Sequence, residues 1–123
     1  MLLKKLFFAV AISGLVVTSA HASDVKHFKG EQPKNLAEAF SILAKYNAKL
    51  EAATSSEPTP MQMSEIHQMT YSLENALEFI DDHIDEVEEN LEHVHKASER
   101  MDTKTVLEKG KAYLMGSKEL LDN

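Results

Sequence analysis

Cysteine is absent from this chain of 123 residues, and so is tryptophan. Without cysteine the protein has no disulfide bond, no thiolate metal site, no covalently attached c-type haem and no cysteine nucleophile. Glycine and proline are scarce, with four and three residues, and neither occurs between residues 61 and 101. Nothing in that stretch would therefore break a helix.

Basic residues are lacking between Leu50 and His95, a stretch that holds twelve acidic residues. Once the first 22 residues are set aside as a signal peptide, the chain keeps 11 basic against 20 acidic residues, a net charge of −9. A surface of that sign repels nucleic acid and anionic lipid, so we expect neither as a partner. The acidic stretch is interpreted as a solvated helix face. The alternative is a docking surface for a basic partner or for divalent cations.

Long apolar runs are also rare, and the one that stands out lies in the first 22 residues. Lysines at positions 4 and 5 precede an apolar run over residues 6–17, and Ala20-His21-Ala22 supplies the small residues that a signal peptidase accepts. The run is too short for a comfortable membrane span. We therefore predict a signal peptide over residues 1–22, a mature start at Ser23, and an exported, periplasmic protein with no membrane span after signal removal.

The 101 residues that remain are enough for a single small domain. Gly30 and Pro33 favour an extended N-terminal arm over residues 23–34. Residues 35–123 are predicted to form one helical domain, with helices over about 36–53, 60–100 and 103–121. The helix starts rest on capping patterns: Asn35 with Glu38, Thr59 with Pro60 and Gln62, and Asp102 or Thr105.

Apolar residues in the second of these segments recur every seven residues. One series is Ile66, Leu73, Ile80, Val87, Val94 and Met101, and a second is Met63, Thr70, Leu77, Ile84, Leu91 and Ser98. Because the phase is unbroken, we predict one continuous helix of about 40 residues, roughly 60 Å long. In the third segment Leu107, Leu114 and Leu121 are expected to form the packing spine, with Gly110 and Ser117 on the same face.

These patterns predict an all-α fold, a three-helix antiparallel arrangement around one long central helix with coiled-coil-like packing, as in a helical hairpin or bundle. The outer helices are each about half as long as the central one, so one lies along its first half and the other along its second. Such a layer is about two helices thick and leaves part of the seven-residue stripe in water. We therefore expect a protein partner or a second copy, with a homodimer favoured.

Met61, Met63, His67 and Met69 form the most suggestive cluster for metal chemistry. Thioether and imidazole ligands suit Cu(I), and Met63 and His67 are one helical turn apart. The favoured interpretation is structural, because Met63 lies on the apolar stripe, Met69 flanks it, and methionine is an ordinary core residue. No cofactor is therefore expected, with copper or a non-covalently bound haem as the alternative. No nucleophile elbow, phosphate loop or zinc motif occurs, so we do not expect an enzyme.

Tyr71 and Phe79 lie off the main apolar stripe of the long helix. Either they meet the N-terminal arm, with Phe28 the expected neighbour, or they belong with His67 to a surface that binds a partner. The arm is favoured, because solitary aromatic side chains usually find an internal neighbour. His67 is expected to hydrogen-bond to Asn47, whose amide would otherwise be buried without a partner.

Two segments carry a resemblance to a known family. Residues 25–30 (Val-Lys-His-Phe-Lys-Gly) and residues 65–77, which include His-Gln-Met-Thr-Tyr-Ser-Leu-Glu from His67 to Glu74, resemble a family of small exported proteobacterial proteins of unknown function, DUF6746. The resemblance implies an all-helical secreted domain and assigns it no activity or ligand. His67 and Tyr71 belong to the shared pattern, whereas Met61 and Met63 do not.

The sequence thus favours a non-enzymatic helical protein of the periplasm that acts through protein–protein contact or as an accessory factor. The alternative is a copper- or haem-binding module that uses His67 and the nearby methionines.

Overall fold

The computed structural model describes residues 28–123, which form three helices: α1 (Leu36–Ala53), α2 (Pro60–Glu99) and α3 (Thr103–Leu121). The predicted signal peptide, the start at Ser23 and the first part of the arm lie outside the described residues. α2 runs without a break for 40 residues, so the prediction of one continuous central helix is confirmed. None of these three helices is long and apolar enough to cross a membrane.

Each helix begins where a side chain can accept a hydrogen bond from the free N–H groups of the first turn. The N–H of Glu38 donates to Asn35 Oδ1 (2.9 Å) at α1, and the Glu38 carboxylate accepts from the N–H of Lys34. Thr59 and Gln62 form a complete capping box at α2, with Pro60 as the first helical residue. The N-cap of α3 is Asp102, whose Oδ1 accepts a hydrogen bond from the N–H of Thr105.

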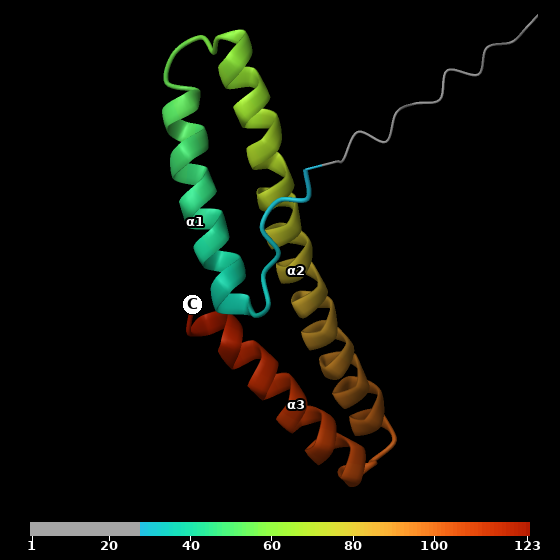
Figure 1. Cartoon of the computed structure of the whole chain (residues 1–123). Helices are drawn as coiled ribbons and strands as arrows, with labels where there is room; N and C mark the ends of the chain where they lie inside the picture. Colours follow the sequence, from blue (N-terminus) through green and yellow to red (C-terminus); the bar gives the residue numbers. More distant parts are fainter. Residues whose placement is uncertain (1–27) are drawn as a thin grey trace, which may run out of the picture.

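The helices form a single layer that is two helices wide (Figure 1). α1 lies along the first half of α2 and α3 along the second half, each antiparallel to it, and both pack against it. The expected all-α fold, with shorter helices packed around one long central helix, is confirmed. The chain from residue 28 to the start of α1 crosses over α2 on one side of this layer (Figure 1).

Part of the second seven-residue series of α2 stays in water, in agreement with the expectation that two half-length helices leave part of the stripe uncovered. Leu77, Ile84 and Leu91 of that series are exposed. The row that packs beside the first series is instead Met69, Ala76, His83, Asn90 and Ala97, none of which is exposed. Ala76 and Ala97 are fully buried, and their small side chains let α1 and α3 approach α2 closely on this side.

The expected spine of α3 is wrong, because Leu107, Leu114 and Leu121 all face solvent. α3 turns its glycines toward α2, as expected for Gly110. A Cβ atom on Gly116 would lie 2.7 Å from Val87 Cγ2, and one on Gly110 would lie 3.9 Å from Val94 Cγ2. The close approach at Gly116 fixes the rotation of α3, and this rotation leaves the three leucines outside.

The buried core is small for a chain of this size. Among the described residues the buried hydrophobic side chains are Leu36, Ala39, Ile42, Ala76, Val87 and Ala97. Ala39, Ile42 and Ala76 form one cluster between α1 and α2, against which Phe79 and Ile80 pack. Much of the apolar content of the helices therefore remains at the surface.

Candidate functional site

Hydrogen bonds fix the N-terminal arm to α2, with donors on the arm as well as on α2. The N–H of Glu31 donates to Ser72 Oγ (2.9 Å), and Asn75 Nδ2 donates to the carbonyls of Lys29 (2.8 Å) and Glu31 (3.0 Å). Ser72 is fully buried under the arm. Gly30 has a φ of +69°, and a Cβ atom there would lie 2.7 Å from the backbone nitrogen of Ser72. Only glycine suits that conformation and that contact.

The arm is also tied to α1 by an ion pair. Lys45 Nζ lies 2.7 Å from Glu31 Oε1. The hydrogen bond from Lys45 lowers the pKa of the Glu31 carboxyl, and the same bond raises the pKa of Lys45. Both side chains are about half exposed, so this pair helps to orient the arm more than it stabilises the fold.

His67, Tyr71 and Phe28 form a small aromatic group where the arm meets α2. The Tyr71 ring centroid lies 6.3 Å from that of Phe28 and 5.2 Å from that of His67, and the Tyr71 hydroxyl lies 3.3 Å from His67 Nε2. The expected contact between Tyr71 and Phe28 is confirmed. The expected bond from His67 to Asn47 is wrong, because Asn47 lies exposed on α1 and His67 pairs within α2 instead.

Phe79 packs on the cluster of Ala39, Ile42 and Ala76 between α1 and α2. In the sequence it groups with Tyr71 because both lie off the expected stripe. The assignment of His67, Tyr71 and Phe79 to a partner surface stays a prediction.

The four residues of the predicted copper cluster do not converge on one point. Met61 and Met63 are exposed, whereas Met69 is half-buried and lies beside Phe28 and Tyr46. Successive positions along a helix turn by about 100°, so only Met63 and His67 share a face. No group of three or more histidine, aspartate or glutamate side chains able to hold a metal ion is present among residues 28–123.

His83 is a residue that the sequence reasoning missed. It lies in the packed row of α2, and its Nε2 donates to the carbonyl of Gly116 at 3.0 Å. Glu119 of α3 approaches the same nitrogen at 3.8 Å. Its position in the sequence could have indicated this role. His83 lies three residues after Ile80, in the same packed row of α2 as Ala76 and Asn90. The hydrogen bond from His83 and the lack of a side chain at Gly116 hold the middle of α3 against α2.

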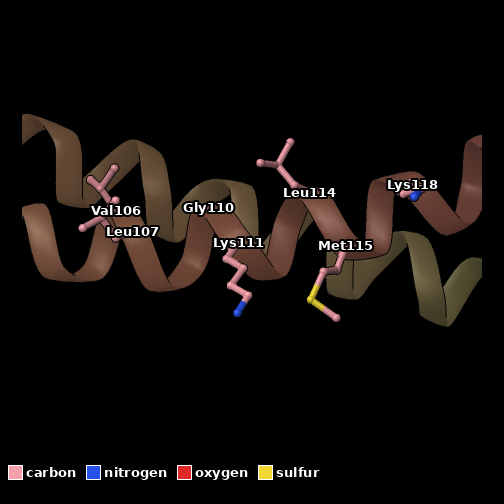
Figure 2. Close-up of a pocket in the computed structure, with 7 residues that line it drawn as sticks. All are labelled: Val106, Leu107, Gly110, Lys111, Leu114, Met115 and Lys118. Atoms are coloured by element: carbon pink, nitrogen blue, oxygen red, sulfur yellow. The ribbon is translucent and has the colours of Figure 1, made fainter.

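A shallow apolar hollow on α3 is lined by Val106, Leu107, Gly110, Leu114 and Met115, with Lys111 and Lys118 at its edge. Figure 2 shows that all seven residues come from α3 alone and that Leu114 and Met115 point in different directions. The hollow is thus part of an open helix surface and not an enclosed binding cavity.

An exposed apolar surface is shared by α2 and α3, and we call it the outer apolar face. It consists of Leu77, Ile84 and Leu91 on α2 and Leu107, Leu114 and Leu121 on α3. All six side chains are more than one third exposed. Their seven-residue spacing on each helix places them in two straight rows.

Both rows lie on the same side of the helix layer. The opposite side is marked by a hollow that His83 and Asn90 of α2 share with Ala112 and Glu119 of α3. On α2, His83 and Asn90 lie three residues after Ile80 and Val87, whereas Ile84 and Leu91 lie four residues after them, and so on the other side of that row. On α3, Ala112 and Glu119 precede the half-buried residues Tyr113 and Leu120, whereas Leu114 and Leu121 follow them.

Comparison with known proteins points to one family and to no activity. No curated protein and no solved structure matches the chain significantly. The model of the family of unknown function DUF6746 matches residues 1–122, nearly the whole chain. The protein therefore belongs to the DUF6746 family.

Proposed function

We propose that this chain is an exported helical protein of the periplasm that acts through protein–protein contact, as a binding or accessory factor and not as an enzyme. The outer apolar face carries this proposal. Monomeric proteins rarely leave a large contiguous apolar patch in water, and such patches usually mark interaction sites. Here six large aliphatic side chains form two parallel rows, although the helices that bear them are otherwise rich in charge.

The partner is another protein or a second copy of the chain, and we favour a homodimer. α1 and α3 cover one side of α2 and leave the row of Leu77, Ile84 and Leu91 open. A second layer of helices on this face would complete a four-helix cross-section over the second half of α2.

Photo-crosslinking in the native host tests the protein-binding role. Leu114 and Met115 are neighbours with similar exposure (66% and 60%), but their side chains point in different directions (Figure 2), and only Met115 also lines the hollow on the other side of the layer. A photoreactive side chain in place of Leu114 should form a covalent adduct with a protein, and one in place of Met115 should not. Absence of any protein adduct at position 114 would contradict the proposal.

Fractionation of the native host cells tests export. The protein should be recovered from the periplasmic fraction with Ser23 as its first residue, as shown by intact mass. Recovery of an uncleaved chain from the cytoplasm would refute this part of the proposal.

The alternative function is a copper- or haem-binding module. Its support is the exposed pair of Met63 and His67, one helical turn apart on α2. An absorption spectrum and metal analysis of protein purified from the host would show haem or copper directly. If the pair binds Cu(I), a titration should show sub-micromolar affinity that both Met63→Leu and His67→Ala abolish. If His67 is structural, His67→Ala should lower the melting temperature of the metal-free protein and Met63→Leu should leave it nearly unchanged.

A further inference from the structure

The outer apolar face is bordered by opposite charges on its two long edges. On the α3 edge, Lys104, Lys111 and Lys118 repeat every seven residues, and all three are exposed. On the α2 edge lie the exposed acidic residues Glu78, Asp81, Asp85, Glu88 and Glu92, of which Glu92 also pairs with Lys96 of the same helix. Within residues 28–123, none of the three lysines takes part in an ion pair.

The two charged edges are in register along the helices. Gly116 lies against Val87 and Gly110 against Val94, so α2 and α3 run antiparallel with these residues at the same height. Lys118 is therefore level with Asp85, and Lys111 is level with Glu92. The apolar rows separate the lysine edge from the acidic edge within one chain.

We propose that the outer apolar face binds a second copy of this chain, with the two-fold axis running along the direction of α2. The proposal rests on the proposed protein-binding role of this face and adds the partner and its orientation. An axis along α2 places α2 of each chain over α3 of the other. The lysine edge of one chain then meets the acidic edge of its partner on both sides, and the six aliphatic side chains of each copy meet in the middle.

The other way to stack the same two faces is disfavoured by charge. A two-fold axis across the helices would place α2 over the partner's α2, and α3 over the partner's α3. Acidic edges would then face each other, and so would lysine edges, which costs free energy and slows association. Charge thus selects parallel α2 helices over antiparallel ones, a choice that the apolar rows alone leave open.

Analytical ultracentrifugation of the mature chain tests whether the face pairs. We expect twice the mass of one chain at micromolar concentration. Leu114→Glu should return the mass of a single chain with an unchanged helical spectrum, because this side chain is exposed in the monomer. The matched control Met115→Glu, whose side chain is not part of the outer apolar face, should remain dimeric. A single-chain mass for the unchanged protein would overturn the inference, whereas a protein adduct at position 114 would still support the proposed function.

Charge reversal tests the orientation. Lys118→Glu and Asp85→Lys should each weaken dimerisation by about tenfold at low salt, because each removes two rim pairs per dimer. Combined in one chain they should restore the affinity, since the pair is re-formed with its charges exchanged. An axis across the helices predicts instead that Lys118→Glu strengthens pairing or leaves it unchanged, and that result would overturn the proposed orientation.

Disulfide cross-linking gives a second measure of orientation. Because the chain has no cysteine of its own, only the introduced cysteines can form disulfide bonds. Two single variants, Asp85→Cys and Lys118→Cys, are distinguished by a mass tag and mixed. Under mild oxidation they should form mainly disulfide dimers that contain one chain of each variant. The control pair Asp82→Cys and Glu108→Cys lies on the opposite side of the layer and should not cross-link. Disulfides formed mainly between identical Asp85→Cys chains would contradict the parallel arrangement.

Discussion

A single backbone conformation closes the turn between α2 and α3. Met101 has a φ of +57°, in the left-handed region, and its side chain is 86% exposed. The N–H of Asp102 donates to the carbonyl of Ala97 (2.9 Å) and the N–H of Met101 to that of Ser98 (3.2 Å). These two bonds form the Schellman motif, whose left-handed residue is usually glycine.

Met101→Gly should therefore stabilise the protein, because glycine adopts the left-handed conformation without the steric cost that a Cβ atom brings. We expect a gain of about 1 kcal/mol in the free energy of unfolding, measured by urea denaturation. Met101→Ala keeps the Cβ atom and should leave stability nearly unchanged. A loss of stability in the glycine variant would mean that the exposed methionine makes contacts that outweigh the backbone cost.

At the scale of the helix pair, replacement of each of the two glycines of α3 by alanine should change the free energy of unfolding in opposite directions. A methyl group at Gly116 would lie 2.7 Å from Val87 Cγ2, so Gly116→Ala must move α3 away from α2. We expect a loss of about 1–3 kcal/mol from this overpacking, together with disturbance of the bond between His83 and the Gly116 carbonyl.

Gly110→Ala is the matched comparison. Its methyl group would lie 3.9 Å from Val94 Cγ2, an ordinary contact, while alanine favours the helix. This variant should gain about 0.5–1 kcal/mol in thermal or urea unfolding. If both variants shifted stability in the same direction, the close approach at Gly116 would not determine how α3 packs.

The start of α3 should be sensitive to acid. Asp102 accepts hydrogen bonds from the hydroxyl (2.7 Å) and the N–H (3.1 Å) of Thr105, and these bonds lower the pKa of its carboxyl. A carboxyl with a lowered pKa stabilises the folded state above its ordinary pKa of about 4, and that contribution is lost as the pH falls through the lowered value.

Asp102→Asn provides the comparison, because asparagine also caps helices but does not titrate. The melting temperature of the unchanged protein should fall more steeply below about pH 4 than that of the variant. Glu31 and Glu92, whose pKa values are also lowered by lysine partners, titrate in both proteins and cancel in the difference. Parallel pH profiles would show that the cap contributes no charge-dependent stability.

For the whole molecule, the balance between a small core and a large exposed apolar face ties stability to association. Six buried hydrophobic residues, three of them alanine, form the core of the described chain, while six larger aliphatic side chains remain outside. Burial of apolar surface is the main source of folding free energy. A substantial part of the stability should therefore come from pairing.

The melting temperature should accordingly rise with protein concentration, because association stabilises the folded state by mass action. Leu114→Glu should remove this dependence and melt at one temperature across a hundredfold range of concentration, whereas Met115→Glu should keep it. Differential scanning calorimetry gives both measurements. A melting temperature of the unchanged protein that does not vary with concentration would show that the single chain folds without help from a partner.

Helix positions were determined by sequence because their signals are local. Caps at Asn35, Thr59 and Asp102, and the lack of glycine and proline across α2, act through neighbours within one turn. The predicted boundaries consequently lie within one residue of the observed helices. The lysine row of α3 and the acidic row of α2 can also be found in the sequence. They indicate an interface only once the structure shows that they border the outer apolar face.

The faces of those helices were decided only by the tertiary structure. A seven-residue repeat places Ile80 and Val87 on the seam, but it leaves open whether the residues three or four positions later complete it. The close approach of Gly116 to Val87 selected the row with His83 and Asn90, and so left Ile84 and the leucines of α3 outside. Packing between segments far apart in the chain determines the interaction surface, because rotation about a helix axis changes no local preference and is fixed only by the shape of the partner helix.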